Sequence, residues 1–318
     1  MHYYLAPMEG ITGYIYRSAY FDFFHNIDKY FTPFITPHEK RSFNKKEWND
    51  LLPEHNYGRV TIPQILTNRA EDFIRISKEL GELGYEEINL NLGCPSGTVV
   101  SKGRGAGFLG MKDELNGFFE EVFLKVDVRV SVKTRIGVES PEEFPALLDI
   151  FNQYPICELI VHPRVRRNQY RNVPNLTSFR MAAEYSVNPV VYNGDLFTSA
   201  DFKQFSEEFP TVDTIMMGRG ILANPCLIDE IEGRGTLTKE ILHRFHDRLY
   251  EDYAREMSGE RNLLFKMKEL WVYMVQMFTN YEKYWKKIRK ADHLTDYEIA
   301  VSLLFAEQEI NPAARWHI

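Results

Sequence analysis

The chain has 318 residues, of which 44% are hydrophobic and 26% are charged. This composition is typical of a folded globular protein and excludes collagen-like, low-complexity and largely disordered chains. The formal net charge of −7 excludes a protein coated in basic residues, so that any contact with nucleic acid has to depend on local patches.

Membrane spans, secretion signals and disulfide frameworks are not expected. No stretch approaches the roughly 18 apolar residues that a membrane helix needs, and the segment from Met1 to Pro7 lacks the basic and apolar regions of a secretory signal. The three cysteines, Cys94, Cys157 and Cys226, are widely spaced and form no C-x-x-C pair. We therefore expect free thiols, no metal site and a cytoplasmic location.

Eight short runs rich in β-branched and aromatic residues recur along the chain, with room for a helix between consecutive runs. They span residues 3–8, 30–35, 60–66, 87–92, 128–134, 159–162, 190–193 and 214–217. Most are almost continuously apolar, as are strands buried on both faces of a parallel sheet. Segments 70–83 and 142–153 have helical spacing. Eight such units predict an α/β fold, a closed (β/α)8 TIM barrel.

The pattern changes after Gly235. Apolar residues follow helical spacing over 238–278, and a further helix is expected over 295–309. Residues 234–318 contain 14 Lys and Arg against 13 Asp and Glu, a net charge of +1, whereas the first 233 residues carry −8. We predict a barrel domain over 1–235 and a helical domain over 236–318.

Residues 281–290 contain five basic side chains among three aromatic ones. One interpretation is a solvated helix face. The other is an RNA contact, because clustered Lys and Arg neutralise phosphates and aromatic rings stack on bases. The candidate RNA-binding residues are Lys283, Lys286, Lys287, Arg289 and Lys290, with Lys266 and Lys268 on the preceding helix.

Polar residues and glycines stand at the ends of seven of the eight predicted strands, where TIM barrels place their active sites. The set comprises Glu9 with its neighbours Pro7 and Met8, Gln64 within the third run, and Asn91, Cys94, Lys133, Arg135, His162, Asn193, Gly194, Asp195, Gly218 and Arg219. Each polar group left unpaired against an apolar core would cost ~1 to 3 kcal/mol. A shared site is therefore a better explanation than packing.

The glycines after the seventh and eighth strands allow backbone N–H groups to approach a phosphate, and Arg219 adds a charge. Two tight turns are the alternative.

Lys133 and His162 end neighbouring strands and can donate hydrogen bonds to a planar, acceptor-rich ring, while Gln64 can form hydrogen bonds with the amide edge of that ring. An oxidised flavin fits this description, whereas the separate alternatives are a packed histidine and a surface lysine.

Cys94 follows a strand and precedes a glycine-rich segment, 97–110, that is long enough to act as a lid. We expect its thiol at the barrel mouth beside Asn91, and packing roles for Cys157 and Cys226; a buried, inert cysteine is the alternative. Residues 105–110 match G-x-G-x-x-G but come well after their strand, so a dinucleotide-binding turn is disfavoured.

The chain resembles the tRNA dihydrouridine synthases over about residues 3–225. The motifs that carry the resemblance are APMEG at 6–10, Gln64, NLGCPS at 91–96, KTR at 133–135, VHPR at 161–164, QY at 169–170, NGD at 193–195 and GRG at 218–220. Two positions depart from the family pattern. Asn89 stands where Asp is usual, and Pro163 stands where Gly is frequent.

The resemblance implies FMN in the barrel mouth, NADPH as reductant, and reduction of a uridine C5–C6 bond in tRNA. Nothing in the sequence requires more than one copy of the chain, so we expect a monomer. It implies that Cys94 is the general acid at C5 and that Asn91 and Arg135 hold the uracil. It places FMN contacts on Pro7, Met8, Glu9, Gln64, Lys133, His162, Asn193, Gly194, Asp195, Gly218 and Arg219. Alternatives are ribosomal RNA as substrate, a flavin barrel acting on a small molecule, and a non-catalytic RNA-binding protein.

Overall fold

A sheet of nine parallel strands forms the centre of the computed structural model, which describes residues 1–38, 42–311 and 313–315. In chain order the strands are β1 (His2–Leu5), β2 (Lys29–Phe31), β3 (Thr61–Ile62), β4 (Gln64–Ile65), β5 (Glu87–Leu92), β6 (Arg129–Arg135), β7 (Leu159–His162), β8 (Val190–Tyr192) and β9 (Thr214–Met217). Their order in the sheet is β3-β2-β1-β9-β8-β7-β6-β5-β4.

The two ends of this order, β3 and β4, are separated in the chain by Pro63 alone. Proline has no N–H to give to a ladder, so it divides the single strand expected over 60–66 into two. The N–H of Leu66 donates to the carbonyl oxygen of Ile35 at 2.8 Å, which joins the end of the divided strand to the segment that follows β2. The sheet thereby closes on itself, and the predicted TIM barrel is confirmed.

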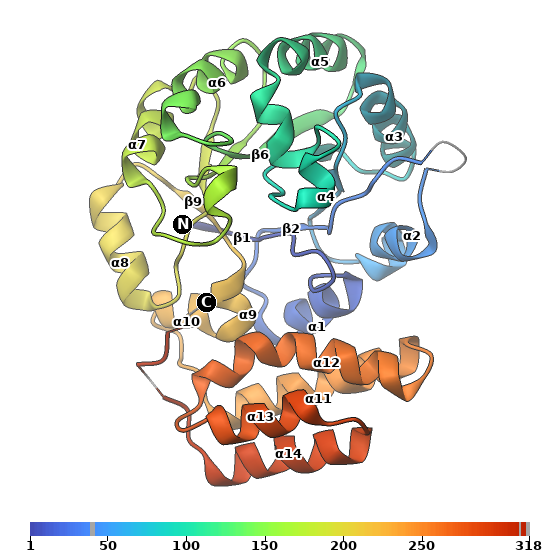
Figure 1. The fold of residues 1–318 in the computed structure, drawn as a ribbon, viewed down its shortest axis with the longest axis vertical. Helices are drawn as coiled ribbons and strands as arrows, with labels where there is room; N and C mark the ends of the chain where they lie inside the picture. The colour runs from blue at the N-terminus through green and yellow to red at the C-terminus, as the bar shows by residue number, and fades with distance from the viewer. Residues whose placement is uncertain (39–41, 312, 316–318) are drawn as a thin grey trace.

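Helices surround the barrel (Figure 1). They are α1 (Tyr14–Phe24), α2 (Lys45–Leu51), α3 (Ala70–Glu82), α4 (Gly97–Val100), α5 (Lys112–Lys125), α6 (Phe144–Phe151), α7 (Leu176–Tyr185), α8 (Ser199–Glu208), α9 (Arg219–Ala223) and α10 (Leu227–Ile231). The segment predicted over 70–83 forms α3. The one predicted over 142–153 forms α6, which is preceded by a 3₁₀ turn, Pro141–Glu143.

The alternation of side chains along each strand decides what faces the barrel interior. Tyr3 and Leu5 belong to the large core between strands and helices, whereas Tyr4 and Ala6 belong to a separate inner cluster. This cluster consists of Tyr4, Ala6, Phe31, Ile62, Ile160, Val191 and Met216. On β5 and β6, Ile88, Leu90, Val130 and Val132 belong to the large core. The intervening inward positions carry polar residues, namely Asn89, Asn91, Ser131 and Lys133.

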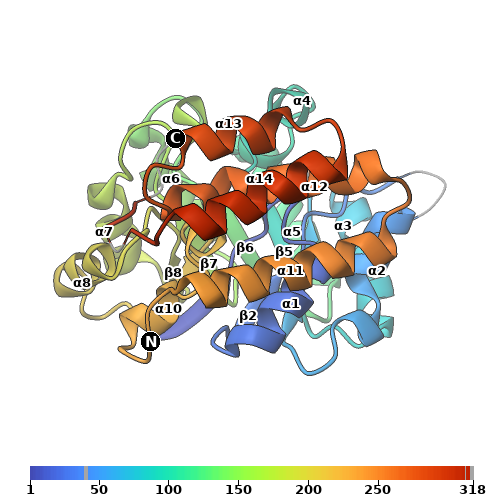
Figure 2. The same ribbon diagram turned by 90° about the horizontal axis from the view of Figure 1, so that it is seen from below.

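Four helices lie side by side against one flank of the barrel (Figures 1 and 2): α11 (Lys239–Glu256), α12 (Glu260–Met274), α13 (Glu282–Lys290) and α14 (Leu294–Glu307). The helical segment expected over 238–278 is two helices, because Gly259 has a φ of 86° and breaks it.

The helical region is joined to the barrel by packing. The ring of Phe245 on α11 meets that of Tyr16 on α1 edge to face, with centroids 5.8 Å apart, and one hydrophobic core runs through both regions. The division into domains at 235 stays a prediction. Over the parts of the chain that the structure describes, no helix combines the length and the apolar character needed to cross a bilayer.

Candidate active site

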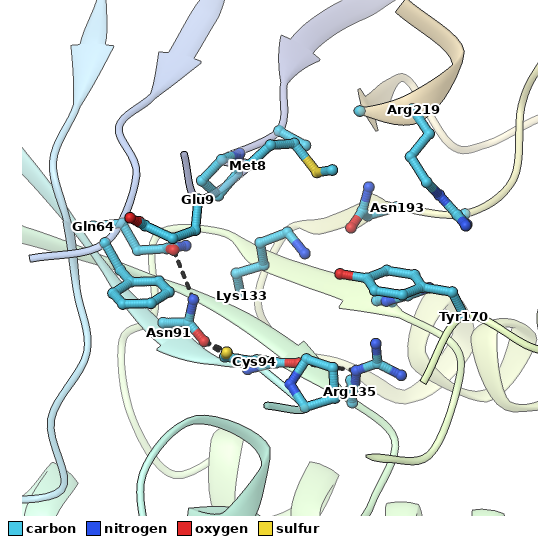
Figure 3. A pocket seen from close by; sticks show the side chains of 18 of the residues that line it. Met8, Glu9, Gln64, Asn91, Cys94, Lys133, Arg135, Tyr170, Asn193 and Arg219 are labelled. Atoms are coloured by element: carbon cyan, nitrogen blue, oxygen red, sulfur yellow. Dashed lines mark hydrogen bonds between the residues drawn. The ribbon is translucent and has the colours of Figure 1, made fainter. Parts of the chain in front are cut away.

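The carboxyl ends of the strands meet around a cavity of about 240 Å³ (Figure 3). All 14 residues expected to hold cofactor or substrate, or to act in catalysis, line it: Pro7, Met8, Glu9, Gln64, Asn91, Cys94, Lys133, Arg135, His162, Asn193, Gly194, Asp195, Gly218 and Arg219. Phe34, Tyr170 and Phe197 line it as well, although no sequence pattern singled them out as contacts. The structure therefore brings the predicted set together, and the role of each member stays a prediction.

A chain of amide hydrogen bonds crosses the floor of the barrel from β4 to β6. The side-chain Nε2 of Gln64 donates to Oδ1 of Asn89 at 2.7 Å, and Nδ2 of Asn91 donates to Oε1 of Gln64 at 2.7 Å. Asn89 in turn donates to the hydroxyl of Ser131 at 2.9 Å. Asn89 is thus part of the site's support, and its inward position two residues before Asn91 is the signal that could have indicated this role.

Asn91 also shapes the turn that carries Cys94. Its Oδ1 accepts the backbone N–H groups of Gly93 at 3.0 Å and of Cys94 at 2.9 Å. Cys94 is half-buried and lines the cavity, so its thiol is not sealed in the core, and its chemical role stays a prediction. Burial raises the pKa of the Cys94 thiol above its ordinary value, and the backbone N–H of Ser96 together with Arg135 only partly offsets this. The thiol is therefore protonated at neutral pH and is suited to donating a proton.

The glycines that follow Cys94 allow the chain to pack closely against the backbone of Cys94. Gly105 has a φ of 56°, and a Cβ at this position would lie 2.8 Å from the carbonyl oxygen of Cys94. That same oxygen accepts the N–H of Ala106 at 3.0 Å. Residues 97–110 are folded as α4 and a 3₁₀ helix, Gly105–Gly110, with Phe108 buried. The G-x-G-x-x-G pattern is thus explained by close packing beneath the thiol.

The cavity has a strongly positive electrostatic character. Four cationic side chains act on His162: Lys133, Arg135, Arg164 and Arg219. Burial, together with these charges, holds the pKa of His162 well below its ordinary value. Burial and then Arg135 lower the pKa of Lys133 to about 7. The side chain of Lys133 points into the middle of the cavity (Figure 3), and its ammonium makes no hydrogen bond to any residue that the structure describes.

The two carboxylates among the described residues that line this cavity both have partners. Asp195 forms ion pairs with Arg164 and with Arg219, the latter at 2.5 Å. Glu9 forms an ion pair with Lys46 at 2.8 Å, on the rim. Since one carboxylate serves two arginines, positive charge exceeds negative charge in the cavity. This excess favours an anionic ligand.

Tyr170 spans the cavity between two arginines. Its ring centroid lies 4.6 Å from the guanidinium carbon of Arg219 and 5.4 Å from that of Arg135, so both make cation–π contacts with it. The ring of His162 is stacked on it, with the centroids 6.1 Å apart. Tyr170 appeared in the sequence only as part of a motif, and its place over the cavity depends on the fold.

The glycines that follow β8 and β9 are required by close packing. A Cβ on Gly194 would lie 2.0 Å from the hydroxyl of Tyr192, and a Cβ on Gly220 would lie 2.2 Å from the carbonyl oxygen of Leu196. A Cβ on Gly218 would lie 3.2 Å from that of Ala6. Close packing accounts for Gly194 and Gly220, while the phosphate interpretation depends on Arg219 and the positive charge beside them.

The candidate RNA-binding residues fall into two groups. On α13, the exposed basic side chains are Lys283, Lys286, Lys287, Arg289 and Lys290, and Glu282 is exposed beside them. Between them Tyr284 and Ile288 are buried, so the aromatic ring of Tyr284 belongs to the core and cannot stack on a base. Figures 1 and 2 show α13 on the same side of the molecule as α4, which follows the carboxyl end of β5.

The two lysines on α12 have intramolecular partners. Lys266 donates to the carbonyl oxygen of Gly10 at 2.5 Å and pairs with Glu269 at 2.7 Å. Lys268 donates to the carbonyl oxygen of Ala291, at the end of α13. Lys266 thus joins the helical region to the loop that carries Glu9, and Lys268 joins two helices of that region.

Comparison with known proteins places these features in context. The family described as dihydrouridine synthase (Dus) matches residues 4–313. "tRNA-dihydrouridine synthase B" of Pasteurella multocida is 27% identical over 72% of this chain and 68% of its own. "Probable tRNA-dihydrouridine synthase 2" of Bacillus subtilis is 26% identical over 79% of both chains.

Solved structures share the fold at low identity. Histamine dehydrogenase from Rhizobium sp. 4-9 matches with a TM-score of 0.55 and 11% identity, covering 85% of this chain and 49% of its own. Morphinone reductase in complex with tetrahydroNAD matches with a TM-score of 0.51 and 12% identity, covering 74% of this chain and 88% of its own. These likenesses concern the barrel architecture.

Proposed function

Because this chain belongs to the dihydrouridine synthase family, we propose that it is an oxidoreductase that reduces the C5–C6 bond of a uridine in tRNA, with FMN as its cofactor and NADPH as its reductant. The observation that carries the proposal is the juxtaposition in one cavity of a protonated thiol, Cys94, and a cluster of cations around His162.

The residues present fit a flavin mononucleotide. The group has a planar ring rich in acceptors and a phosphate, and the cavity offers donors and excess positive charge. Lys133 supplies an ammonium that has no hydrogen-bond partner among the described residues, and Arg219 supplies a guanidinium near the glycine turns. Bound FMN would supply the hydride for C6 of the uracil after reduction by NADPH.

The side chains of the protein would donate a proton to the uracil and hold the uracil in place. Cys94 would donate the proton to C5 of the uracil, for which its raised pKa keeps it in the thiol form. Arg135 directs Nε to the carbonyl oxygen of Gly93 at 2.9 Å and Nη1 to two further carbonyls. Its contact with the uracil would therefore come from Nη2. Asn91 would use the second N–H of its amide.

Cys94→Ala tests the proton donor. We expect the variant to bind flavin and to be reduced by NADPH at the wild-type rate, while uridine reduction in tRNA falls by about 10²-fold or more, the range of general acid catalysis. Cys157→Ala is the matched control, because Cys157 does not line the cavity, and it should keep full activity. Wild-type activity of Cys94→Ala would refute the assigned role.

RNA as the substrate is favoured over a small molecule by the exposed lysines and arginine of α13. A protein that reduced free uracil or an enone as fast as it reduced RNA would contradict this. Transcripts of tRNA and of ribosomal RNA should be assayed together, and we expect dihydrouridine to form in tRNA. A purified protein that took up no flavin on reconstitution would favour a non-catalytic RNA-binding protein.

A further inference from the structure

Arg164 and His162 make a direct side-chain contact beside the cavity. Nη1 of Arg164 lies 3.0 Å from Nε2 of His162, and the two residues are only 1% and 7% exposed. A guanidinium group has five N–H donors and no acceptor. Nε2 of His162 must therefore accept this hydrogen bond and carries no proton.

Arg164 is held in place by every other donor it has. Nη1 and Nη2 donate to the carboxylate of Asp195, with Nη1 at 3.0 Å. Nη2 and Nε donate to the carbonyl oxygen of Asn172 at 2.5 and 3.1 Å, and Nε also approaches that of Arg171 at 3.3 Å. All five N–H groups have acceptors, so rotation away from His162 would break several buried, charge-assisted hydrogen bonds.

The same surroundings exclude a doubly protonated imidazole. A proton on Nε2 would face the guanidinium of Arg164, and burial with three further cations disfavours a charged ring. A neutral imidazole carries one proton. Since Nε2 has none, the proton is on Nδ1. That nitrogen makes no hydrogen bond to any described residue, and His162 lines the cavity.

We propose that Arg164 is a positioning residue that holds His162 as its Nδ1–H tautomer, so that His162 presents a donor to an acceptor atom of the ligand in the cavity. The tautomer follows from the contacts of Arg164 alone. The identity of the ligand as a flavin rests on the proposed function.

The tautomer can be measured directly. Long-range ¹H–¹⁵N correlation spectra of ¹⁵N-histidine-labelled protein distinguish protonated from unprotonated ring nitrogens. Of the nine histidines, His162 is assigned by the signal that His162→Asn removes. In the wild type we expect a protonated Nδ1 and an unprotonated Nε2, unchanged between about pH 5.5 and 8 because its pKa lies well below its ordinary value. A protonated Nε2 would overturn the proposal.

Two Arg164 variants test the cause. Arg164→Met removes the donor and leaves Asp195 as an acceptor nearby, so the proton should move wholly or partly to Nε2. Arg164→Lys keeps a cationic donor and should retain the Nδ1–H form. An unchanged Nδ1–H signal in folded Arg164→Met would show that Arg164 does not set the tautomer, which contradicts the proposal.

A second pair of variants does not depend on Arg164 being replaceable. The amide nitrogen of Asn is as far from Cβ as Nδ1 of histidine, and that of Gln is as far as Nε2. His162→Asn should therefore bind FMN about tenfold more tightly than His162→Gln, the effect of one buried hydrogen bond. Equal or reversed affinities would overturn the donor role of Nδ1. Absence of FMN binding by the wild type would instead refute the proposed function and leave the tautomer measurement valid.

Discussion

The side-chain oxygen of Asn91 accepts the backbone N–H of Cys94 at 2.9 Å, so a residue expected to hold the substrate also fixes the position of the thiol. The same oxygen accepts the N–H of Gly93, and the amide nitrogen donates to Gln64. Asn91 is thus a link between the floor of the barrel and the turn above it. A substitution at Asn91 should therefore change the position of the Cys94 thiol even when no ligand is bound.

Asn91→Ala is expected to leave two backbone N–H groups without their acceptor. The free energy of unfolding should fall by about 2 kcal/mol, and the rate of Cys94 alkylation by iodoacetamide should change because the turn loosens. Chemical denaturation and mass-spectrometric alkylation rates measure the two effects. Ser131→Ala, at the other end of the amide chain, is the control and should leave the alkylation rate near that of the wild type.

The protonation of Cys94 should respond to nearby charges with opposite signs. Glu9 raises the pKa of the Cys94 thiol and Lys133 lowers it. Glu9→Gln should therefore increase the thiolate fraction and speed alkylation at pH 8, by about two- to threefold. Lys133→Met should slow alkylation much less at this pH, because Lys133, with a pKa of about 7, is then mostly neutral. In the wild type the rate should still be rising above about pH 9, since burial raises the pKa. A plateau at a lower pH would contradict this account.

Lys133 should destabilise the protein when no anionic ligand is bound. Its pKa is about 7 in the folded protein against about 10.4 in an unfolded chain. Between these values the unfolded state binds more protons, so the contribution of Lys133 to stability improves as the pH rises from about 7. Below that pH the full penalty applies.

Lys133→Met should therefore stabilise the ligand-free protein at about pH 6.5 by about 2 kcal/mol, since a pKa unit corresponds to about 1.4 kcal/mol and water in the cavity screens part of the effect. The gain should shrink towards about pH 9. Chemical denaturation at the two pH values measures it, and a gain that grew with pH would be inconsistent with a buried, proton-losing lysine.

The exposed lysines of α13 should serve RNA binding rather than folding. Lys286→Gln combined with Lys290→Gln should weaken tRNA binding by about tenfold and reduce the slope of log K against log salt by about one for each phosphate that is no longer neutralised. Lys125→Gln, on the outer helix α5, is the control for the loss of a surface lysine outside α13. Lys268→Met should instead lower thermal stability, because Lys268 binds the carbonyl oxygen of Ala291. Equal tRNA affinity in the α13 variant would remove this helix from the interface.

The barrel and the gathering of its strand-end residues could be predicted from the amino-acid sequence. Parallel strands place their carboxyl ends at one edge, so residues as distant as Met8 and Arg219 were predicted to share a site, and they do. The family followed from the same motifs. The barrel and its shared site depend on the local periodicity of apolar residues and on the order of the strands along the chain, and both can be seen in the amino-acid sequence.

Only the tertiary structure shows which groups are the hydrogen-bond partners of individual side chains. Arg164 binds His162 and Asp195, Asn89 supports Gln64, and Lys266 binds Gly10 across the two regions. The fold also buries Tyr284 while its basic neighbours are exposed. Many such partners are tens to hundreds of residues apart, and others depend on which helix face meets the core. Composition and spacing identify the groups that need hydrogen bonds, whereas three-dimensional packing determines which groups provide them.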